Sequence, residues 1–541
     1  MARLFFVFLF ALLVAITPTS SALAAVPTPE VLSPPGGARG TTVTVTAVAV
    51  SESWPCQIFC SRPELQFKVL EEKGKFTVTI PADCPPGVAW IRLHNAEGAA
   101  PLRPFVIGTL PEVIEVEPNN ELAKAQVLPS TAVVVQGQPG AREDVDNYAV
   151  NLKAGQTLVA DFDGNRTLGA ACDGVLQIVS PDGFVLEQND DDQGLDPRIA
   201  FTAPVDGRYY VRTFSFPAAT DSSVNFAGSS IWHYRLTITT ERFTDFTLPL
   251  AATRGTAGEV EARGWNLGAE PVKVAIPATD ADEMTLLVPQ SGNFVTLPTV
   301  SHPVLVEQEP NALAQPNAIP VPVGISGIVS APDDADFFRF PAKKGQPLLV
   351  KVTARSRGSL IDPVVAICDA TGKELQRLDD QGDKRDPELT WNPPADGDYL
   401  LTVTDLHHRG GPRFYYHVNI SLPKPDYRVT VAADRFVLPI DKPLEIPITV
   451  ERLGGFKDEI EVSVTGLPEG VTAAAVKSLA EGDTSKAVKL VISGNPGPFS
   501  VPLQITASSA AEPKVIRKPT FKLTQYDLDT NYLWLTVLKK P

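Results

Sequence analysis

The sequence EVEPNN at residues 115–120 returns as EQEPNA at residues 307–312. Further along the chain, EDVDNY at residues 143–148 is matched by DDADFF at residues 333–338. Matches that follow one another in the same order, at nearly constant spacing, indicate that a structural unit has been duplicated. This repetition is the main guide to the fold, because the two copies are expected to form the same structure.

The repetition extends to turns and strands. KAGQ at residues 153–156 is matched by KKGQ at 343–346, and DGRY at 206–209 by DGDY at 396–399. Asp-Gly pairs supply the positive backbone dihedral angles that tight turns require. The segments that follow them alternate in the manner of half-buried strands. Each copy therefore predicts an antiparallel β-sandwich.

Composition extends this prediction to the whole chain. The chain has 541 residues, too many for a single hydrophobic core, so several domains are expected. Its 50 prolines, against 2 methionines, favour short strands and loops because proline breaks helix interiors. We therefore expect an all-β fold of tandem antiparallel β-sandwiches.

The N-terminal segment predicts export. Arg3 precedes an apolar run at residues 4–16, and small residues at 22–24 suit a signal peptidase. The run is short for a bilayer span, which favours a cleaved secretory signal over the alternative of an uncleaved anchor. The expected location is secreted, periplasmic or at the cell surface, and we expect no membrane span.

The net charge of the protein limits the kinds of molecule that it is expected to bind. The formal net charge of −16 removes any general attraction to phosphate backbones, so nucleic acid is not an expected partner. An extracellular or envelope protein or polysaccharide is expected instead.

Five cysteines are present, three of them close together near the start of the mature chain. Because an exported chain can oxidise, we expect one disulfide among Cys56, Cys60 and Cys84, without a preference for the pairing. Zinc is the alternative, but no fourth ligand lies at a suitable spacing. Cys172 and Cys368 are expected to be small buried apolar residues.

The repeated acidic segments contain the candidate metal ligands. Calcium prefers carboxylate and carbonyl oxygens, and residues two apart in an extended segment face the same side. The first candidate set is Glu115, Glu117, Asn119, Asn120, Asp144 and Asp146. The second is Glu307, Glu309, Asn311, Asp334 and Asp336, with Ala312 in place of Asn120. We expect calcium to bind the first set more tightly; the alternative is a solvated acidic linker in each copy.

The motifs together carry a family resemblance. E-P-N-N, then D-x-D-x-Y, then an aromatic strand after Asp-Gly resembles the bacterial pre-peptidase C-terminal (PPC) domain, a secreted β-sandwich related to the collagen-binding domains of clostridial collagenases. The resemblance implies a non-catalytic accessory domain that binds calcium or matrix, often beside a protease. In the clostridial relatives, aromatic residues on an exposed sheet face bind the ligand, and Tyr210, Phe214 and Phe216 are the candidates for such a face here; the alternative is that these rings pack against a second layer.

Other segments resemble immunoglobulin-like or TIG-type modules more loosely, through RGT at residues 39–41 and 254–256 and GWNL at 264–267. The expected organisation is a signal peptide at 1–24, an immunoglobulin-like or TIG-like domain at 26–111, a PPC-like sandwich at 113–241, a short TIG-like module at 243–304, a second PPC-like sandwich at 306–422, an immunoglobulin-like domain at 426–524 and a C-terminal tail at 525–541. Proline-rich junctions predict that these domains form an elongated string.

Catalytic motifs are absent from the sequence. It has no HExxH zinc motif, no GxSxG nucleophile elbow and no phosphate-binding glycine loop. We therefore expect a secreted non-enzyme, a calcium-binding protein that mediates extracellular binding or scaffolding. The alternative is an accessory region or chain of a secreted peptidase or other hydrolase.

Overall fold

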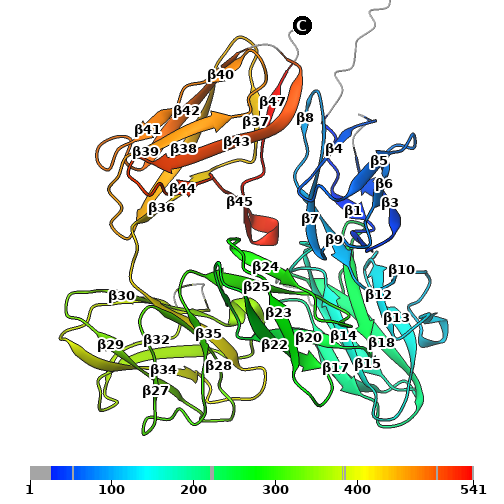
Figure 1. The fold of residues 1–541 in the computed structure, drawn as a ribbon. Coiled ribbons are helices and arrows are strands. Elements are labelled where there is room, and N and C mark those ends of the chain that lie inside the picture. The colour runs from blue at the N-terminus through cyan, green and yellow to red at the C-terminus, as the bar shows by residue number, and fades with distance from the viewer. Residues whose placement is uncertain are drawn as a thin grey trace, which may run out of the picture.

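A computed structural model describes residues 26–50, 54–219, 225–380, 382, 385–494 and 497–538. The expected signal peptide lies outside the described residues. The described part is built of β-strands, with 3-10 turns only at η1 (Leu122–Lys124), η2 (Arg355–Arg357) and η3 (Thr524–Tyr526). Within this part of the chain, no helix is both long enough and apolar enough to cross a membrane. The predicted all-β fold of packed sheets is confirmed (Figure 1).

The first module covers residues 26–111 and packs two sheets, ordered β1-β3-β6-β5 and β2-β9-β7-β4, with β8 beside β7. Phe76, Val78, Ile91 and Phe105 are almost fully buried between them. Its strands are β1 (Val31–Ser33), β2 (Gly36–Ala38), β3 (Thr42–Val48), β4 (Gln57–Cys60), β5 (Gln66–Val69), β6 (Lys75–Thr79), β7 (Gly87–Asn95), β8 (Gly98–Ala99) and β9 (Arg103–Gly108).

The two copies have the same topology. The first copy has sheets β10-β12-β19-β14-β17 and β11-β13-β18-β15-β16, and the second has β26-β28-β35-β30-β33 and β27-β29-β34-β31-β32, so the strands correspond one by one. The first copy contains β10 (Glu112–Ile114), β11 (Gln126–Val127), β12 (Ala132–Gly137), β13 (Asp146–Leu152), β14 (Thr157–Asp163), β15 (Cys172–Val179), β16 (Val185–Asn189), β17 (Arg198–Thr202), β18 (Gly207–Pro217) and β19 (Tyr234–Thr239). The second contains β26 (Val304–Val306), β27 (Asn317–Ala318), β28 (Val323–Ile328), β29 (Asp336–Ala342), β30 (Leu348–Thr353), β31 (Pro363–Cys368), β32 (Glu374–Leu378), β33 (Glu388–Trp391), β34 (Gly397–Asp405) and β35 (Tyr415–Ser421).

A repeated Asp-Pro motif explains part of this identity. Asp196 accepts hydrogen bonds of 2.8 to 3.2 Å from the backbone N–H groups of residues 164–166. Asp386 accepts the corresponding bonds, of 2.9 to 3.1 Å, from residues 354–356. A carboxylate that satisfies three successive donors fixes the loop between two strands. These repeated aspartates are therefore structural.

The short module, residues 243–304, lies between the copies and resembles the first module in one turn. Its strands are β20 (Phe243–Leu248), β21 (Ala252–Thr253), β22 (Gly258–Trp265), β23 (Val272–Ile276), β24 (Glu283–Leu286) and β25 (Val295–Val300), in sheets β20-β22-β23 and β21-β25-β24. In both RGT turns the glycine has a positive φ, 77° at Gly40 and 69° at Gly255, and the arginine N–H donates to the end of a distant strand. The shared turn supports duplication of a pair of modules.

The last module contains a strand that the sequence analysis assigned to a tail. Its strands are β36 (Asp426–Val431), β37 (Arg435–Leu438), β38 (Leu444–Leu453), β39 (Ile460–Thr465), β40 (Val471–Ala473), β41 (Val476–Ser478), β42 (Ala487–Gly494), β43 (Phe499–Ser509), β44 (Ile516–Arg517), β45 (Phe521–Leu523), β46 (Leu528–Thr530) and β47 (Leu533–Val537). Strand β47 is wholly buried and pairs with both β37 and β43. The tail prediction was wrong because an apolar strand with two hydrogen-bonded neighbours is part of the sandwich core.

The modules do not form an elongated string, because the last module returns to the first (Figure 1). Arg92, in β7, donates to the Asp434 carboxylate at 2.8 Å, and both side chains are almost fully buried. Phe59 and His94 pack against Trp534 with ring centroids 5.4 and 4.6 Å apart. Proline-rich linkers restrict only local geometry, whereas these contacts join residues from opposite ends of the chain.

A second contact reinforces this closure. The hairpin β45-β46 carries η3 away from the last module, and Tyr526 packs edge-on against Trp90 at 5.0 Å. Gln525 donates to the Gly169 carbonyl of the first copy at 3.0 Å. The last module is thus fixed to two others.

Buried ion pairs hold the short module between the copies. Arg413 of the second copy binds Asp192 of the first copy and Asp245 of the short module, each at 2.7 Å. Arg198 of the first copy also binds Asp245, at 2.5 Å, and binds Asp161 at 2.7 Å. One network of charges therefore joins three modules.

The expected disulfide is not present, since all five cysteines are free thiols. Cys56 and Cys84 are buried in the core of the first module as small apolar side chains. Burial raises the pKa of Cys56 and of Cys60 to about 11, which keeps both protonated.

Removing the buried carboxylate at the closure should be costly. Asp434→Ala leaves the Arg92 charge buried without its partner, for which about 3–5 kcal/mol is typical. Glu445→Ala is the control, since its pair with Lys489 is exposed and worth at most about 1 kcal/mol. Thermal unfolding should show a much larger loss for Asp434→Ala, and small-angle scattering should show a larger radius of gyration. Equal behaviour of the two variants would contradict the closure.

Acid should weaken the same contact through His94. Burial, followed by the nearby Arg92 charge, lowers the pKa of His94 to about 4. The unfolded chain, with an ordinary histidine pKa of about 6.5, binds the proton first, so stability is complete above about pH 6.5 and is lost as the pH falls toward 4. The melting temperature of His94→Gln should depend less on pH in this window than that of the wild type. Identical pH profiles would refute the assignment.

Candidate metal centre

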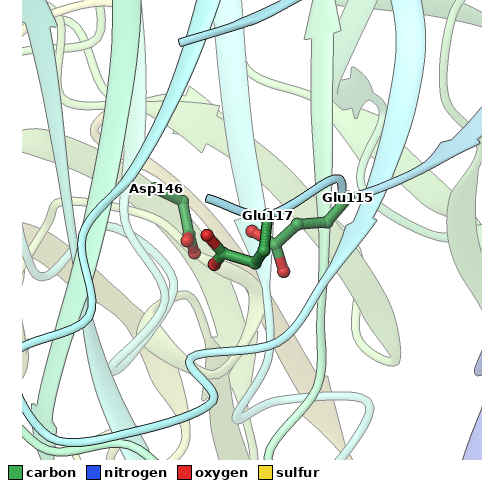
Figure 2. Close-up of side chains that lie close together, drawn as sticks. All are labelled: Glu115, Glu117 and Asp146. Carbon is green, nitrogen blue, oxygen red and sulfur yellow. The ribbon is translucent and has the colours of Figure 1, made fainter. Parts of the chain in front are cut away.

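The first acidic cluster lies where β10 ends and β13 begins. The carboxylates of Glu115, Glu117 and Asp146 point toward one another (Figure 2), with one oxygen of each within 4.8 Å of the others. Glu115 follows the edge strand directly, while Asp146 is the first residue of a central strand. The repeated sequence therefore brings together residues from two segments, as predicted.

Glu115 is fixed in place by three donors within 3.1 Å, and the Tyr234 hydroxyl lies 3.3 Å from its Oε1. The Tyr148 hydroxyl donates to Oε1 at 2.8 Å, the Gln138 backbone N–H to Oε2 at 2.8 Å, and the Asn119 side-chain amide to Oε1 at 3.1 Å. A carboxylate held in this way is preorganised as an electrostatic partner for a cation.

Asp146 is the most constrained member of the cluster. It is 1% exposed, and the Tyr234 hydroxyl donates to Oδ2 at 2.6 Å. Its Oδ1 is buried and has no hydrogen-bond partner among the described residues. Burial, followed by the charge of Glu115, raises the pKa of Asp146 to about 10, and burial also raises the pKa of Glu117. The cluster lacks positive charge, which a proton or a cation can supply.

Of the remaining candidates, only Asn119 joins the cluster. It is fully buried, its backbone N–H donates to Glu117 at 2.8 Å, and its side-chain oxygen has no hydrogen-bond partner in the described part of the chain. Asn120 is exposed and donates instead to Asp144 at 3.2 Å. Asp144 also accepts a bond from the Gly140 N–H at 2.7 Å. Asn120 and Asp144 therefore stand beside the cluster as a separate pair.

The second cluster uses a different set of the corresponding positions. Glu309, Asp334 and Asp336 each place an oxygen within 4.8 Å of the others. Glu307 is held beside them by the Ile328 N–H at 2.5 Å and by Tyr416 at 2.8 Å. Burial raises the pKa of Glu307 to about 7 and that of Asp336 to about 8.

Ala312 accounts for this difference. In the first copy Asn120 binds Asp144 and holds it outside the cluster, whereas Ala312 cannot hold Asp334 in this way. Asn311 keeps the place of Asn119, donating to Glu307 at 3.2 Å. With Ala312 in place of Asn120, the second cluster contains Asp334 and not Glu307, the residue that corresponds to Glu115 of the first cluster. The prediction that calcium binds the second set less tightly depended on counting Asn120 as a ligand, and the geometry does not use Asn120 in that way.

Both clusters offer donors that suit calcium. Carboxylate and amide oxygens are hard ligands, and the unpartnered oxygens of Asn119 and Asp146 are those that a cation would satisfy. In the second copy, Oδ1 of Asp336 is likewise buried without a partner. The residues present therefore fit a calcium ion better than an empty solvated linker.

The sequence analysis did not identify the tyrosines that support the clusters. Tyr234 donates to Asp146 and Tyr416 to Asp336, each at 2.6 Å. Tyr234 is the first residue of β19 and Tyr416 the second residue of β35, and these strands pair with β12 and β28. Their equivalent positions in the two copies were the available signal.

The aromatic face lies on β18, in the same sheet as β13, the strand of Asp146. Tyr210, Phe214 and Phe216 alternate with buried residues along β18 and are half-buried. Phe226 packs against Phe214 at 4.7 Å and Phe216 at 5.4 Å, so two of the three rings already pack together.

Removing a tyrosine hydroxyl should lower the stability of the protein only where that hydroxyl donates to a buried carboxylate. Tyr234→Phe removes the donor to Asp146, and an unsatisfied buried acceptor costs about 1–3 kcal/mol. Tyr210→Phe is the matched control, a half-buried tyrosine of the same copy that contacts neither cluster. In chelator, Tyr234→Phe should lower the melting temperature, while Tyr210→Phe should not. A null effect of Tyr234→Phe would show that the hydroxyl does not support the cluster.

Comparison with known proteins identifies the repeated fold. The family model of the bacterial pre-peptidase C-terminal domain matches residues 144–215. No curated protein matches the chain. Among solved structures, the pre-peptidase C-terminal domain of Bacillus anthracis collagenase is 17% identical, with 19% of this chain and 93% of that chain covered and a TM-score of 0.16.

Two further structures resemble parts of the chain. The Aeromonas hydrophila periplasmic inhibitor of g-type lysozyme is 14% identical, with 24% of this chain and 97% of that chain covered and a TM-score of 0.16. Escherichia coli alpha-2-macroglobulin is 10% identical, with 89% of this chain and 45% of that chain covered and a TM-score of 0.13. At these TM-scores neither likeness bears on function. The chain is therefore a multidomain β-sandwich protein whose first copy contains a match to the bacterial pre-peptidase C-terminal domain, and whose second copy has the same topology.

Proposed function

We propose that this protein is an exported, non-catalytic binding or scaffolding protein in which each of the two copies holds a calcium ion. The observation that carries the proposal is the pair of acidic clusters, each built around one buried aspartate. Each contains an aspartate, Asp146 or Asp336, that has an unpartnered oxygen and a raised pKa. Burying a carboxylate beside other carboxylates without a counter-charge is costly, and a divalent cation removes that cost.

The family supports a role in binding. The pre-peptidase C-terminal domain is a non-catalytic accessory domain found in secreted peptidases. The sequence contains none of the common hydrolase motifs. The contact between the first and last modules makes the set of modules a rigid support, which can present loops and sheet faces to a partner. An extracellular or envelope protein or polysaccharide is the class of partner that we propose.

Calcium titration of the whole mature chain tests the proposal. Calorimetry should give two sites for the wild type and one for either Asp146→Asn or Asp336→Asn, because each substitution removes a charged oxygen from one cluster. Calcium at a hundredfold excess over Kd should add about 2.7 kcal/mol of stability for each site. Asp182→Asn, at an exposed turn of the first copy, is the control and should retain both sites. Absence of calcium binding by the wild type would reject the proposal.

A further inference from the structure

A cavity of about 500 Å³ lies between the two copies, closed on its other sides by the short module and the end of β9. The first copy contributes the outer face of β14 and β19, and the second contributes the same face of β30 and β35. Its volume lies in the range of small-molecule sites, which commonly form where domains meet.

Matching positions of the two copies line the cavity. In the first copy Asp163 is paired with Arg235 across two strands, and in the second Thr353 is paired with His417 at the same place. All four residues line the cavity. The duplicated fold thus forms a chamber whose two walls have the same shape but different chemistry.

Most charges in the walls are already compensated. Arg235 binds Glu112 through two nitrogens, at 3.0 and 2.6 Å. Arg198 is shared between Asp161 and Asp245. These groups shape the walls and leave little charge free for a ligand.

The groups that remain are hydrogen-bond donors. Nη1 of Arg166 is buried and has no partner among the described residues, although Nη2 of this guanidinium binds Asp161 and Nε lies 3.6 Å from Asp163 and 3.8 Å from Asp196. Arg357 lines the cavity from the second copy, and its side chain forms no ion pair with any described residue. Asn419 lines it too and directs its oxygen to His302 and His417, so its amide hydrogens remain. A ligand rich in acceptors would satisfy these donors.

Apolar surface completes the cavity. Phe246 and Tyr415, stacked at 4.0 Å, lie among the lining residues together with Leu250 and Phe294. Such a wall excludes water and strengthens the pairing of an anion with an arginine. We propose that the cavity binds a small molecule of sugar size that carries an oxyanion, a carboxylate or a phosphate, held by Arg166 and Arg357.

Calorimetry on the full mature chain tests this inference with D-glucuronate, inorganic phosphate and D-glucose as probes. Glucuronate, phosphate or both should bind, and glucose should bind at least about tenfold more weakly, since a hydrogen bond to a charged group contributes about 1.5–3 kcal/mol. Preference for glucuronate would indicate a sugar acid, and preference for phosphate a phosphorylated ligand. The titrations are run in calcium and again in chelator, so that failure here is separable from failure of the calcium sites.

Two arginines of the same 3-10 turn provide the variants. Arg357→Gln should weaken binding about tenfold or more. Arg355→Gln makes the same charge change outside the cavity lining and should bind as the wild type does. The inference is overturned if neither anion binds at about 10 mM, a weak affinity by any measure. Binding of glucose equal to that of the anions, or equal losses in the two variants, would overturn it as well.

Discussion

The arrangement of modules depends on the buried charge network centred on Arg413. This guanidinium binds two carboxylates from different modules, Asp192 and Asp245, and Asp245 is in turn bound by Arg198. Trp265 of the short module lies beneath both arginines, 6.0 Å from Arg198 and 5.2 Å from Arg413. Separating any one module would break at least one of these ion pairs, so the network couples the positions of the three modules.

Fixing three modules determines where the others lie. With the copies held on either side of the short module, the first and last modules are directed toward each other, and Arg92 with Asp434 forms the contact. The cavity is a consequence of the same arrangement, because Asp161, Arg198 and Asp245 of the network also line it. The ion pairs therefore hold the modules so that the first and last modules meet, and they also shape the cavity between the two copies.

The copies and their acidic clusters could be predicted from the sequence because the same short motifs recur in the same order in both copies. The spacing of two residues predicted that Glu115 and Glu117 face the same side, and the duplication drew attention to the same positions in both copies. Partners from distant segments could not be reached in this way: Tyr234 lies 88 residues from Asp146, and Arg413 lies 221 from Asp192. Strand β47 was missed for a similar reason, since a short apolar run at a chain end has no repeat or turn to mark it.

Comparison of the two copies separates structural from specific residues. Residues that fix a loop or a carboxylate are the same in both copies, as Asp196 and Asp386 are. They are kept because both copies form the same strands and loops. Positions on the outer sheet face differ, as with Arg235 and His417, because each copy meets a different neighbour there. Arg235 needs Glu112 beside it, whereas burial lowers the pKa of His417 to about 4 and keeps it neutral. The residues of the two walls have diverged, whereas the fold of the two copies has not. A cavity between duplicated domains needs such a difference if it is to distinguish one end of a ligand from the other.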